Sequence, residues 1–141
     1  MSKRVVVVED SLIQAALLQE HFEALGYEVV VVHTGNEVVP AVDHFNPDVI
    51  ILDYLLPDLN GIEVCKKLKC DLQMRLTPIL MYSAEDNLQN MVRAYEAGAD
   101  YYVVKNEESN KVLQLLIETI FKRKGRNLGA TRPSIEKTIA S

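Results

Sequence analysis

The sequence predicts an α/β domain in which a five-stranded parallel sheet is covered by helices on both faces. Residues 5–8 are four consecutive valines, without the apolar–polar alternation of a half-exposed strand, and such a run is typical of a strand buried on both faces. Further along the chain, segments of strand character alternate with segments of helical spacing. This alternation indicates βαβ units joined by right-handed crossovers, and therefore a doubly wound sheet.

Five strands and five helices are expected, in alternation. Gly26 ends the first helical segment, Pro40 lies in the first turn of the second, where proline is tolerated, and the breaker segment 57–61 precedes the third. The apolar residues at helical spacing in the first helix are Leu12, Ile13, Ala16, Leu17 and Leu25. The expected strands are 5–8, 28–32, 49–52, 79–82 and 101–104, and the expected helices are 12–25, 37–45, 61–69, 88–97 and 109–124.

Length and composition favour one soluble domain. The 141 residues fit a domain at 1–124 followed by a polar tail or linker at 125–141, and a 48% hydrophobic content allows a sizeable core. The net charge of −5 argues against a general affinity for nucleic acid, and the basic residues at 122–126 complement the dipole of the last helix. No apolar run approaches the roughly 18 to 20 residues of a membrane span, so a cytoplasmic protein is expected. Cys65 and Cys70 should point to different faces of a helix and stay reduced.

Chemically active side chains follow four of the predicted strands. Ligands of an open parallel sheet bind outside the carboxyl ends of its strands, so the residue after each strand is informative. Glu9 and Asp10 follow the first strand and Asp53 follows the third. Ser83 follows the fourth strand and Lys105 the fifth. Three carboxylates, a hydroxyl and an ammonium group are therefore expected at one edge of the sheet.

These residue types fit phosphoryl transfer to a carboxylate. Three carboxylates in one place repel one another unless a hard cation neutralises them, and oxygen ligands of this kind suit Mg²⁺. Asp53 could then attack phosphorus to form an aspartyl phosphate, with the cation offsetting the phosphoryl charge. Ser83 could donate a hydrogen bond to one phosphoryl oxygen, and Lys105 could contact another.

Four segments resemble the receiver domain of two-component response regulators, over about residues 3 to 124. They are VVVVED at 5–10, IILDYLLPDLNG at 50–61, TPILMYSA at 77–84 and GADYYVVK at 98–105. The resemblance implies a flavodoxin-like fold with strand order 2-1-3-4-5. It implies a single-domain, chemotaxis-regulator-like switch that takes a phosphoryl group from a histidine kinase or phosphotransfer protein.

The resemblance also assigns a role to each site residue. Glu9 and Asp10 would hold Mg²⁺ together with Asp53, the phosphoacceptor, and the backbone carbonyl of Leu55. Ser83 and Lys105 would contact the phosphoryl group. Ser83 and Tyr102 would be the switch residues, with Tyr102 turning inward on phosphorylation. Output would pass to a protein target or a homodimer through the fourth helix, fifth strand and fifth helix, with no nucleic-acid or membrane partner.

Each residue also has an ordinary structural interpretation. Alone, Asp53 would be a solvated strand-end or helix-capping carboxylate, Ser83 the N-cap of the next helix, and Lys105 a surface lysine. Tyr102 could be a core residue of the last strand, and the Leu115, Leu116 and Ile120 side of the last helix could pack on the sheet or form a dimer surface.

Other functions need residues that this chain lacks. An aspartate-nucleophile phosphatase requires a second carboxylate at position 55, which is leucine. A dinucleotide enzyme requires a glycine-rich first turn, and a flavodoxin a phosphate-binding loop, where this chain has Glu9-Asp10-Ser11. A degenerate receiver used only for docking would have lost an acidic, acceptor or lysine position, and none is lost.

Three residues near the site deserve separate expectations. Most receivers have a proline after the lysine, joined by a cis peptide bond, but here Asn106 follows Lys105. A cis bond before a residue other than proline costs roughly 2.5 to 4 kcal/mol, so a trans bond and an altered loop are expected. Leu55 and Glu85 flank the path of water to the phosphoryl group. Glu85 can orient that water, so it is expected to set the lifetime of the phosphorylated state.

Overall fold

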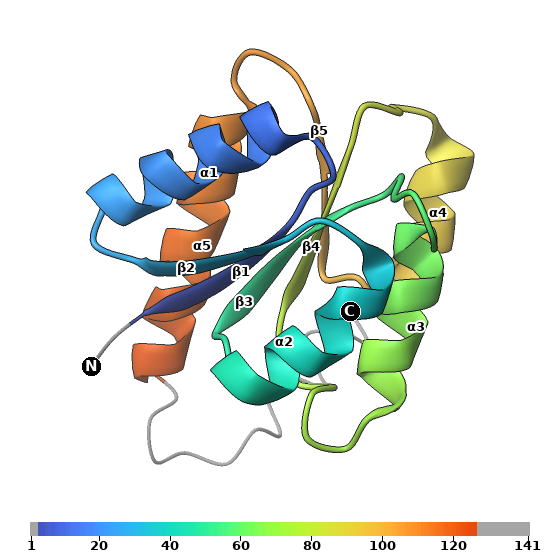
Figure 1. The fold of residues 1–141 in the computed structure, drawn as a ribbon, viewed down its shortest axis with the longest axis horizontal. Coiled ribbons are helices and arrows are strands. Elements are labelled where there is room, and N and C mark those ends of the chain that lie inside the picture. The colour runs from blue at the N-terminus through green and yellow to red at the C-terminus, as the bar shows by residue number, and fades with distance from the viewer. Residues whose placement is uncertain (1–2, 127–141) are drawn as a thin grey trace.

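The computed structural model describes residues 3–126 and contains one parallel sheet of five strands. The strand order is β2-β1-β3-β4-β5, so the predicted fold class and strand order are confirmed (Figure 1). The chain starts in the middle of the sheet and adds strands outward in both directions, with β1 and β3 at the centre. The strands are β1 (Arg4–Val8), β2 (Glu28–Val32), β3 (Val49–Asp53), β4 (Ile79–Ser83) and β5 (Tyr101–Val104).

Helices cover both faces of the sheet. Figure 1 shows α1 and α5 side by side on one face and α2, α3 and α4 on the other. The second helical segment differs from the prediction at its start, because a 3-10 turn, η1 (Gly35–Glu37), precedes the helix. The helices are α1 (Leu12–Ala24), α2 (Val38–Phe45), α3 (Gly61–Cys70), α4 (Leu88–Glu96) and α5 (Ser109–Arg126). Of the predicted tail, residues 127–141 lie outside the described part of the chain.

The central strands supply two hydrophobic cores, one on each face. In β1, Val6 and Val8 face the α2, α3 and α4 layer, whereas Val5 and Val7 face α1 and α5. All four valines are fully buried, which is why the run shows no alternation. Because side chains inside these strands pack on both faces, polar chemistry is confined to the residues at the strand ends.

The helix starts are fixed by polar side chains in the preceding loops. The Ser11 hydroxyl accepts a hydrogen bond from the Gln14 N–H in α1, and the Asn60 side chain accepts one from Glu63 in α3. The cap of α4 is Asn87, whose side chain accepts a hydrogen bond from the Asn90 N–H at 2.8 Å. The alternative role of Ser83 as the N-cap of this helix is therefore wrong.

The buried face of α1 is not the one marked by its first apolar residues. Leu12, Ile13 and Leu17 are 69%, 75% and 56% exposed. The residues that pack on the sheet are Ala15, Leu18 and Phe22. The predicted apolar spacing therefore located the helix correctly, but α1 carries apolar residues on both sides and its outer side faces water.

The cysteines and the last helix follow the structural expectations. Cys65 is buried, Cys70 is exposed, and both are free thiols. In α5, Ile120 is buried and Leu116 packs against the core, while Leu115 is 54% exposed. Two of the three residues considered as a dimer surface therefore belong to the sheet-facing side.

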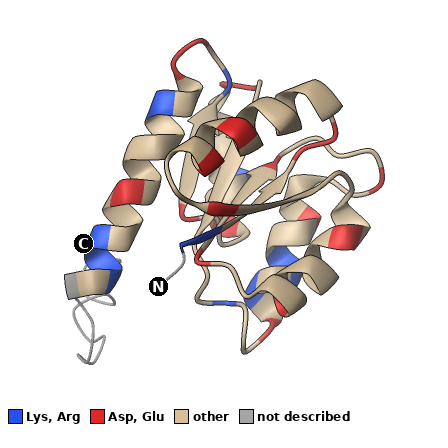
Figure 2. Cartoon of the chain, turned by 60° about the vertical axis from the view of Figure 1, so that its left-hand side comes forward, with Lys and Arg blue, Asp and Glu red and all other residues tan. Residues whose placement is uncertain are grey.

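The basic residues near the end of the chain lie far from the carboxyl edge of the sheet. Figure 2 shows blue segments in the last turns of α5, next to the C-terminus of the described helix. Lys124 there pairs with Asp48, with 2.9 Å between its ammonium nitrogen and a carboxylate oxygen. A cation at a helix C-terminus also offsets the negative end of the dipole.

Two further findings concern the whole described chain. Across residues 3–126, no helix combines the length and apolar character needed to cross a bilayer. No peptide bond in the same range is cis, so the trans bond expected between Lys105 and Asn106 is confirmed.

The two sides of α1 predict a contrast in stability. We expect Leu18→Ala to lower the free energy of unfolding by on the order of 2 to 4 kcal/mol, because it leaves a cavity under α1. The matched change Leu17→Ala, one residue earlier on the exposed side, should cost less than about 1 kcal/mol. Urea unfolding of both variants measures this, and equal losses would contradict the assignment of the two faces.

Candidate phosphoacceptor and metal site

Glu9 and Asp10 lie at the carboxyl end of β1 and differ in exposure. Glu9 is buried, with one carboxylate oxygen 2.9 Å from the Lys105 ammonium nitrogen and the other accepting a hydrogen bond from the Ser11 N–H. Asp10 is exposed. His33, which follows β2, has its Nδ1 2.9 Å from the Glu9 carbonyl oxygen. Since a carbonyl only accepts, Nδ1 is the donor, and this bond fixes the backbone beneath the two carboxylates.

Asp53 is the last residue of β3 and is buried. One of its oxygens lies 3.2 Å from the Lys105 ammonium nitrogen. The other accepts a 3.3 Å hydrogen bond from the Leu55 N–H. The loop that follows β3 therefore folds back over the carboxylate, and the backbone of Leu55 is held close to Asp53 while its side chain is 60% exposed.

The three carboxylates form a potential metal site. One oxygen each from Glu9, Asp10 and Asp53 lies within 4.8 Å of the others. Burial and the neighbouring Glu9 carboxylate raise the pKa of Asp53 to about 7, although the Lys105 ammonium group opposes the shift. One ammonium group does not balance three carboxylates. An all-oxygen set with surplus negative charge and an exposed ligand, Asp10, fits a hard divalent cation that keeps some of its water.

Lys105 joins the two buried carboxylates. Burial alone would lower its pKa, but the ion pairs with Glu9 and Asp53 raise the pKa of Lys105 above its ordinary value. Burial also disfavours the charged form of Glu9, but hydrogen bonding with Asp53 and Lys105 holds the pKa of Glu9 below its ordinary value. Lys105 is therefore a permanent cation at the edge of the sheet, within reach of any group bound to Asp53.

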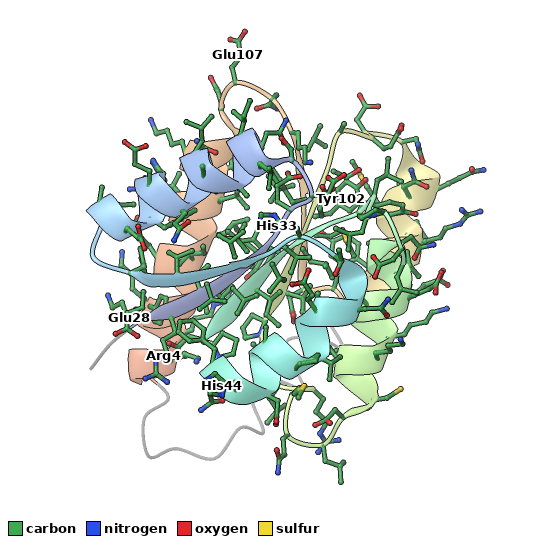
Figure 3. All side chains as sticks on the ribbon, viewed as in Figure 1. Arg4, Glu28, His33, His44, Tyr102 and Glu107 are labelled. Atoms are coloured by element: carbon green, nitrogen blue, oxygen red, sulfur yellow. The ribbon has the colours of Figure 1, made fainter. Side chains whose placement is uncertain are left out.

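Ser83 and Tyr102 are connected through the backbone of one residue, Glu85. Ser83 is fully buried, and its hydroxyl oxygen accepts a 3.0 Å hydrogen bond from the Glu85 N–H. The Tyr102 hydroxyl donates a 2.7 Å hydrogen bond to the Glu85 carbonyl oxygen. Tyr102 is the second residue of β5, opposite Met81; it is half-buried and packs against the core on the α4 side (Figure 3). The loop between β4 and α4 therefore contacts both predicted switch residues.

Asp58 is a residue of the site region that the sequence prediction missed. Its carboxylate accepts hydrogen bonds from the Gly35 N–H at 2.7 Å and the Asn36 N–H at 2.8 Å. Loss of hydration disfavours its charged form, but these N–H groups hold the pKa of Asp58 below its ordinary value. Asp58 thus connects the loop after β3 to the start of η1. Its partners are 22 and 23 residues away, so no local sequence pattern indicates the contact.

Gly61 allows α3 to begin directly against β3, the strand that ends in Asp53. A Cβ atom at this position would lie 2.7 Å from the Asp53 carbonyl oxygen and 3.0 Å from the Tyr54 Cα. The Gly61 N–H donates a 2.7 Å hydrogen bond to the Tyr54 carbonyl oxygen. A side chain at position 61 would therefore displace the backbone that carries Asp53.

All of the predicted side chains of the sheet edge are brought together. Glu9, Asp10 and Asp53 form the carboxylate group, and Lys105 pairs with two of them. Ser83 lies in the adjacent strand, β4, one residue beyond Tyr82, which stands opposite Asp53 in the parallel pair.

A family comparison agrees with this geometry. Residues 5–117 match the family model described as the response regulator receiver domain. The chain belongs to this family. It carries a receiver domain of two-component signalling, and the family match runs from β1 to the middle of α5.

Relatives and solved structures are consistent with that assignment. The chain is 41% identical over 105 residues to the alkaline phosphatase synthesis transcriptional regulatory protein PhoP of Bacillus subtilis, a match that spans 74% of this chain and 43% of PhoP. The chemotaxis response regulator CheY4 of Vibrio cholerae superposes with a TM-score of 0.78 at 26% identity, covering 85% of this chain and 99% of CheY4. The Francisella response regulator 1452 receiver domain superposes with a TM-score of 0.79 at 29% identity, covering 87% and 99% of the two chains.

The raised pKa of Asp53 predicts that ionisation of this residue lowers the free energy of unfolding as the pH rises. Its value of about 7 in the folded protein compares with an ordinary value of 3.8, so the folded state binds this proton more tightly than the unfolded state. The associated stability is present at low pH and is lost as the pH rises through about 7. Without divalent cations, we expect Asp53→Asn to raise the free energy of unfolding at pH 8 by on the order of 1 to 3 kcal/mol.

Denaturant unfolding of wild type and Asp53→Asn from pH 5 to pH 8 (roughly the window in which the proton is lost) measures this difference. Asp43→Asn, at an exposed position in α2, is the control for removing one negative charge. Added Mg²⁺ should narrow the gap between wild type and Asp53→Asn. If the two proteins keep the same stability difference at every pH, the carboxylates do not repel one another as described.

Proposed function

We propose that this chain is a phosphorylation switch in which Asp53 accepts a phosphoryl group from a histidine kinase or phosphotransfer protein, in a Mg²⁺-dependent reaction in the cytoplasm. The observation that carries this proposal is the burial of the Asp53 carboxylate at the junction of Glu9, Asp10 and Lys105. A buried carboxylate that is paired with a lysine and lies beside two further carboxylates is typical of a functional site. A solvated carboxylate that merely ends a strand has no such neighbours.

The transfer forms one bond and breaks another. A carboxylate oxygen of Asp53 attacks phosphorus, and the phosphorus–nitrogen bond of the donor's phosphohistidine breaks, with its electron pair remaining on the imidazole nitrogen. Asp53 must be ionised for the attack, and its raised pKa works against this near neutral pH. Lys105, 3.2 Å away, favours the ionised form and can then move to a phosphoryl oxygen.

The residues that would hold Mg²⁺ are Glu9, Asp10, Asp53 and the backbone carbonyl of Leu55. When bound, the cation would favour the ionised carboxylates and offset the charge of the phosphoryl group. The Leu55 backbone is suited to this role because its N–H already bonds to Asp53. Asp58 supports it by fixing the same loop to η1.

Ser83 and Tyr102 would carry the change to the surface. The Ser83 hydroxyl accepts from Glu85 and so keeps its own hydrogen for a phosphoryl oxygen. Movement of Ser83 toward that oxygen would move the Glu85 backbone, whose carbonyl oxygen accepts the bond from Tyr102. Phosphorylation would then shift the population between two arrangements of the β4–α4 loop and Tyr102.

The output surface we propose is the one formed by α4, β5 and α5. On α4, Leu88, Val92 and Tyr95 recur at helical spacing and are 74%, 46% and 51% exposed. Leu115 adds an exposed apolar residue on α5. Such residues fit a protein target or a second copy of the chain better than a polyanion. PhoP is named as a transcriptional regulatory protein, and this chain spans 43% of its length. For the chain itself we propose output by protein contact, without nucleic acid.

An enzyme of the aspartate-nucleophile phosphatase class fits the site less well. Such an enzyme needs a general acid or base two residues after the nucleophile. Position 55 holds a leucine whose side chain points largely into solvent. We therefore propose that the catalysis of this chain is limited to its own phosphorylation and dephosphorylation.

Acetyl phosphate labelling tests the proposed function directly. Wild-type protein incubated with acetyl phosphate and Mg²⁺ should gain one phosphoryl group, detected by intact mass or by a phosphate-affinity gel. Omission of Mg²⁺ or the change Asp53→Asn should abolish the gain, since Asp53 supplies the attacking oxygen. Labelling that persists in Asp53→Asn, or that needs no metal, would refute the proposal.

Glu85 provides a second test through the lifetime of the phosphorylated state. Its side chain is exposed, and its bonds to Ser83 and Tyr102 use only backbone atoms. We expect Glu85→Ala to slow loss of the phosphoryl group by roughly three- to tenfold, because a carboxylate that orients attacking water is removed. The control is Asp86→Ala, which removes the next exposed carboxylate. Decay rates followed after removal of the donor decide the matter, and an unchanged rate in Glu85→Ala excludes this role.

A further inference from the structure

The turn after Lys105 is organised by Asn106. The side-chain oxygen of Asn106 accepts a 2.8 Å hydrogen bond from the Glu108 N–H. Its carbonyl oxygen accepts two bonds from Ser109, one from the backbone N–H at 3.2 Å and one from the hydroxyl at 2.8 Å. Asn106 thus uses both of its oxygens to hold the chain in a turn that leads directly into α5.

Ser109 extends this network into the sheet. Ser109 is buried, and its hydroxyl oxygen lies 3.1 Å from the hydroxyl oxygen of Tyr82, which is also buried, in β4. A serine hydroxyl has one hydrogen, and that of Ser109 points to the Asn106 carbonyl oxygen. The Tyr82 hydroxyl is therefore the donor to Ser109, and the order of donation is Tyr82 to Ser109 to Asn106.

The backbone on both sides of the Lys105 side chain is hydrogen-bonded, directly or through Ser109, to β4. On one side, the Lys105 N–H donates a 2.7 Å hydrogen bond to the Ser83 carbonyl oxygen. On the other, Asn106 is connected through Ser109 to Tyr82, the residue before Ser83. The Tyr82 ring also lies under the lysine side chain, with the ammonium nitrogen 4.9 Å from the ring centroid. That distance is within the range of a cation–π contact.

We propose that Tyr82 and Ser109, acting through Asn106, are positioning residues that hold Lys105 in reach of Asp53. The inference rests on the proposed function, since it assigns Lys105 to the phosphoryl group. Tyr82 stands opposite Asp53 in the β3–β4 pair, but the hydrogen bonds of the Tyr82 and Ser109 hydroxyl groups run to each other and to Asn106, not to the carboxylates. They restrict the conformations of the long Lys105 side chain before phosphorylation. The entropy cost of ordering that side chain is then not added to the barrier for phosphoryl transfer. The network supplies, on a trans peptide bond, the rigidity that proline lends this position in other receivers.

The network can be removed one hydroxyl at a time. We expect Tyr82→Phe and Ser109→Ala each to lower the rate of phosphorylation by acetyl phosphate roughly tenfold, as a small misplacement of a catalytic group does. Tyr82→Phe keeps the ring under the ammonium group and removes only the donor. Because both changes break the same chain of bonds, the double variant should be no slower than the slower single variant.

Combining the hydroxyl variants with Lys105→Ala tests whether their loss of rate depends on Lys105. In a Lys105→Ala background, Ser109→Ala and Tyr82→Phe should cause no further loss of rate. Equal losses in the presence and absence of Lys105 would overturn the proposal, because the effect would not pass through the lysine. The loop control is Glu107→Ala, which should phosphorylate at the wild-type rate, since its exposed side chain points away from the molecule at the tip of the same loop (Figure 3).

A spectroscopic measurement separates this inference from the proposed function. In the unphosphorylated protein, the Lys105 ammonium group should give a slowly exchanging ¹H–¹⁵N signal, because it is bonded to Glu9 and Asp53. Loss of that signal in Tyr82→Phe and Ser109→Ala, with retention in Glu107→Ala, supports positioning even if wild type accepts no phosphoryl group. Retention of the signal in both hydroxyl variants overturns it, even if wild type is labelled normally.

A variant at the exposed residue of the network, Asn106, provides a test that does not depend on changing a buried side chain. Asn106 is exposed, so Asn106→Ala should leave the core intact while removing the acceptor for Glu108. The Asn106 carbonyl oxygen that accepts from Ser109 is kept in this variant, so we expect smaller losses of the ammonium signal and of the rate than in Ser109→Ala. Larger losses in Asn106→Ala than in both hydroxyl variants would contradict the proposal, because the side chain of Asn106 and not the hydroxyl network would then position Lys105.

Discussion

Repulsion among three carboxylates at the carboxyl edge of the sheet, opposed by one ammonium group, governs the surroundings of the candidate site. Glu9 and Asp53 are buried, and Lys105 lies between them. Burial makes each uncompensated charge expensive, so the proton affinity of Asp53 rises and the lysine stays charged. A divalent cation would offset the surplus negative charge, whereas a phosphoryl group would add to it. The site is therefore sensitive to both.

This balance explains why so much of the surrounding structure is fixed. The Glu9 backbone is held by His33, the loop after Asp53 by Asp58, and the turn after Lys105 by Asn106. Each of these bonds restrains the backbone that carries a charged group, and none neutralises the charge. Without such restraint the side chains would separate and solvate independently. The β4–α4 loop is different, because the backbone of Glu85 bonds to Ser83 through its N–H and to Tyr102 through its carbonyl oxygen, and can move with either.

The sequence was sufficient for the fold and for the placement of the site residues. Buried strands of a parallel sheet read as continuous apolar runs, and the first polar residue after each run must lie at the carboxyl edge. That rule brought Glu9, Asp53 and Lys105 together without any contact prediction. Ser83 was placed correctly by the same rule, although its alternative role as a helix cap was wrong because Asn87 lies closer to the start of α4. The trans bond before Asn106 followed from the cost of the cis form.

Other features depend on contacts between distant parts of the chain. Asp58 bonds to backbone groups in another loop, and Tyr82 meets Ser109 across 27 residues, so neither has a local signature. The buried side of α1 could not be chosen from spacing, because apolar residues occur on both sides of the helix. Which side packs is decided by the sheet, where Leu18 and Phe22 meet the valines of β1.

The exposed apolar residues of α1 have a consequence for the divergence of such proteins. Leu12 and Ile13 stand two and three positions after Asp10, yet they contribute little to either core. A change inside a strand disturbs the packed core on one face of the sheet, and a change at a strand end disturbs the group of charged side chains. Substitutions on the outer side of α1 meet neither constraint. We therefore expect this surface, beside the three carboxylates, to tolerate more sequence change than either core does.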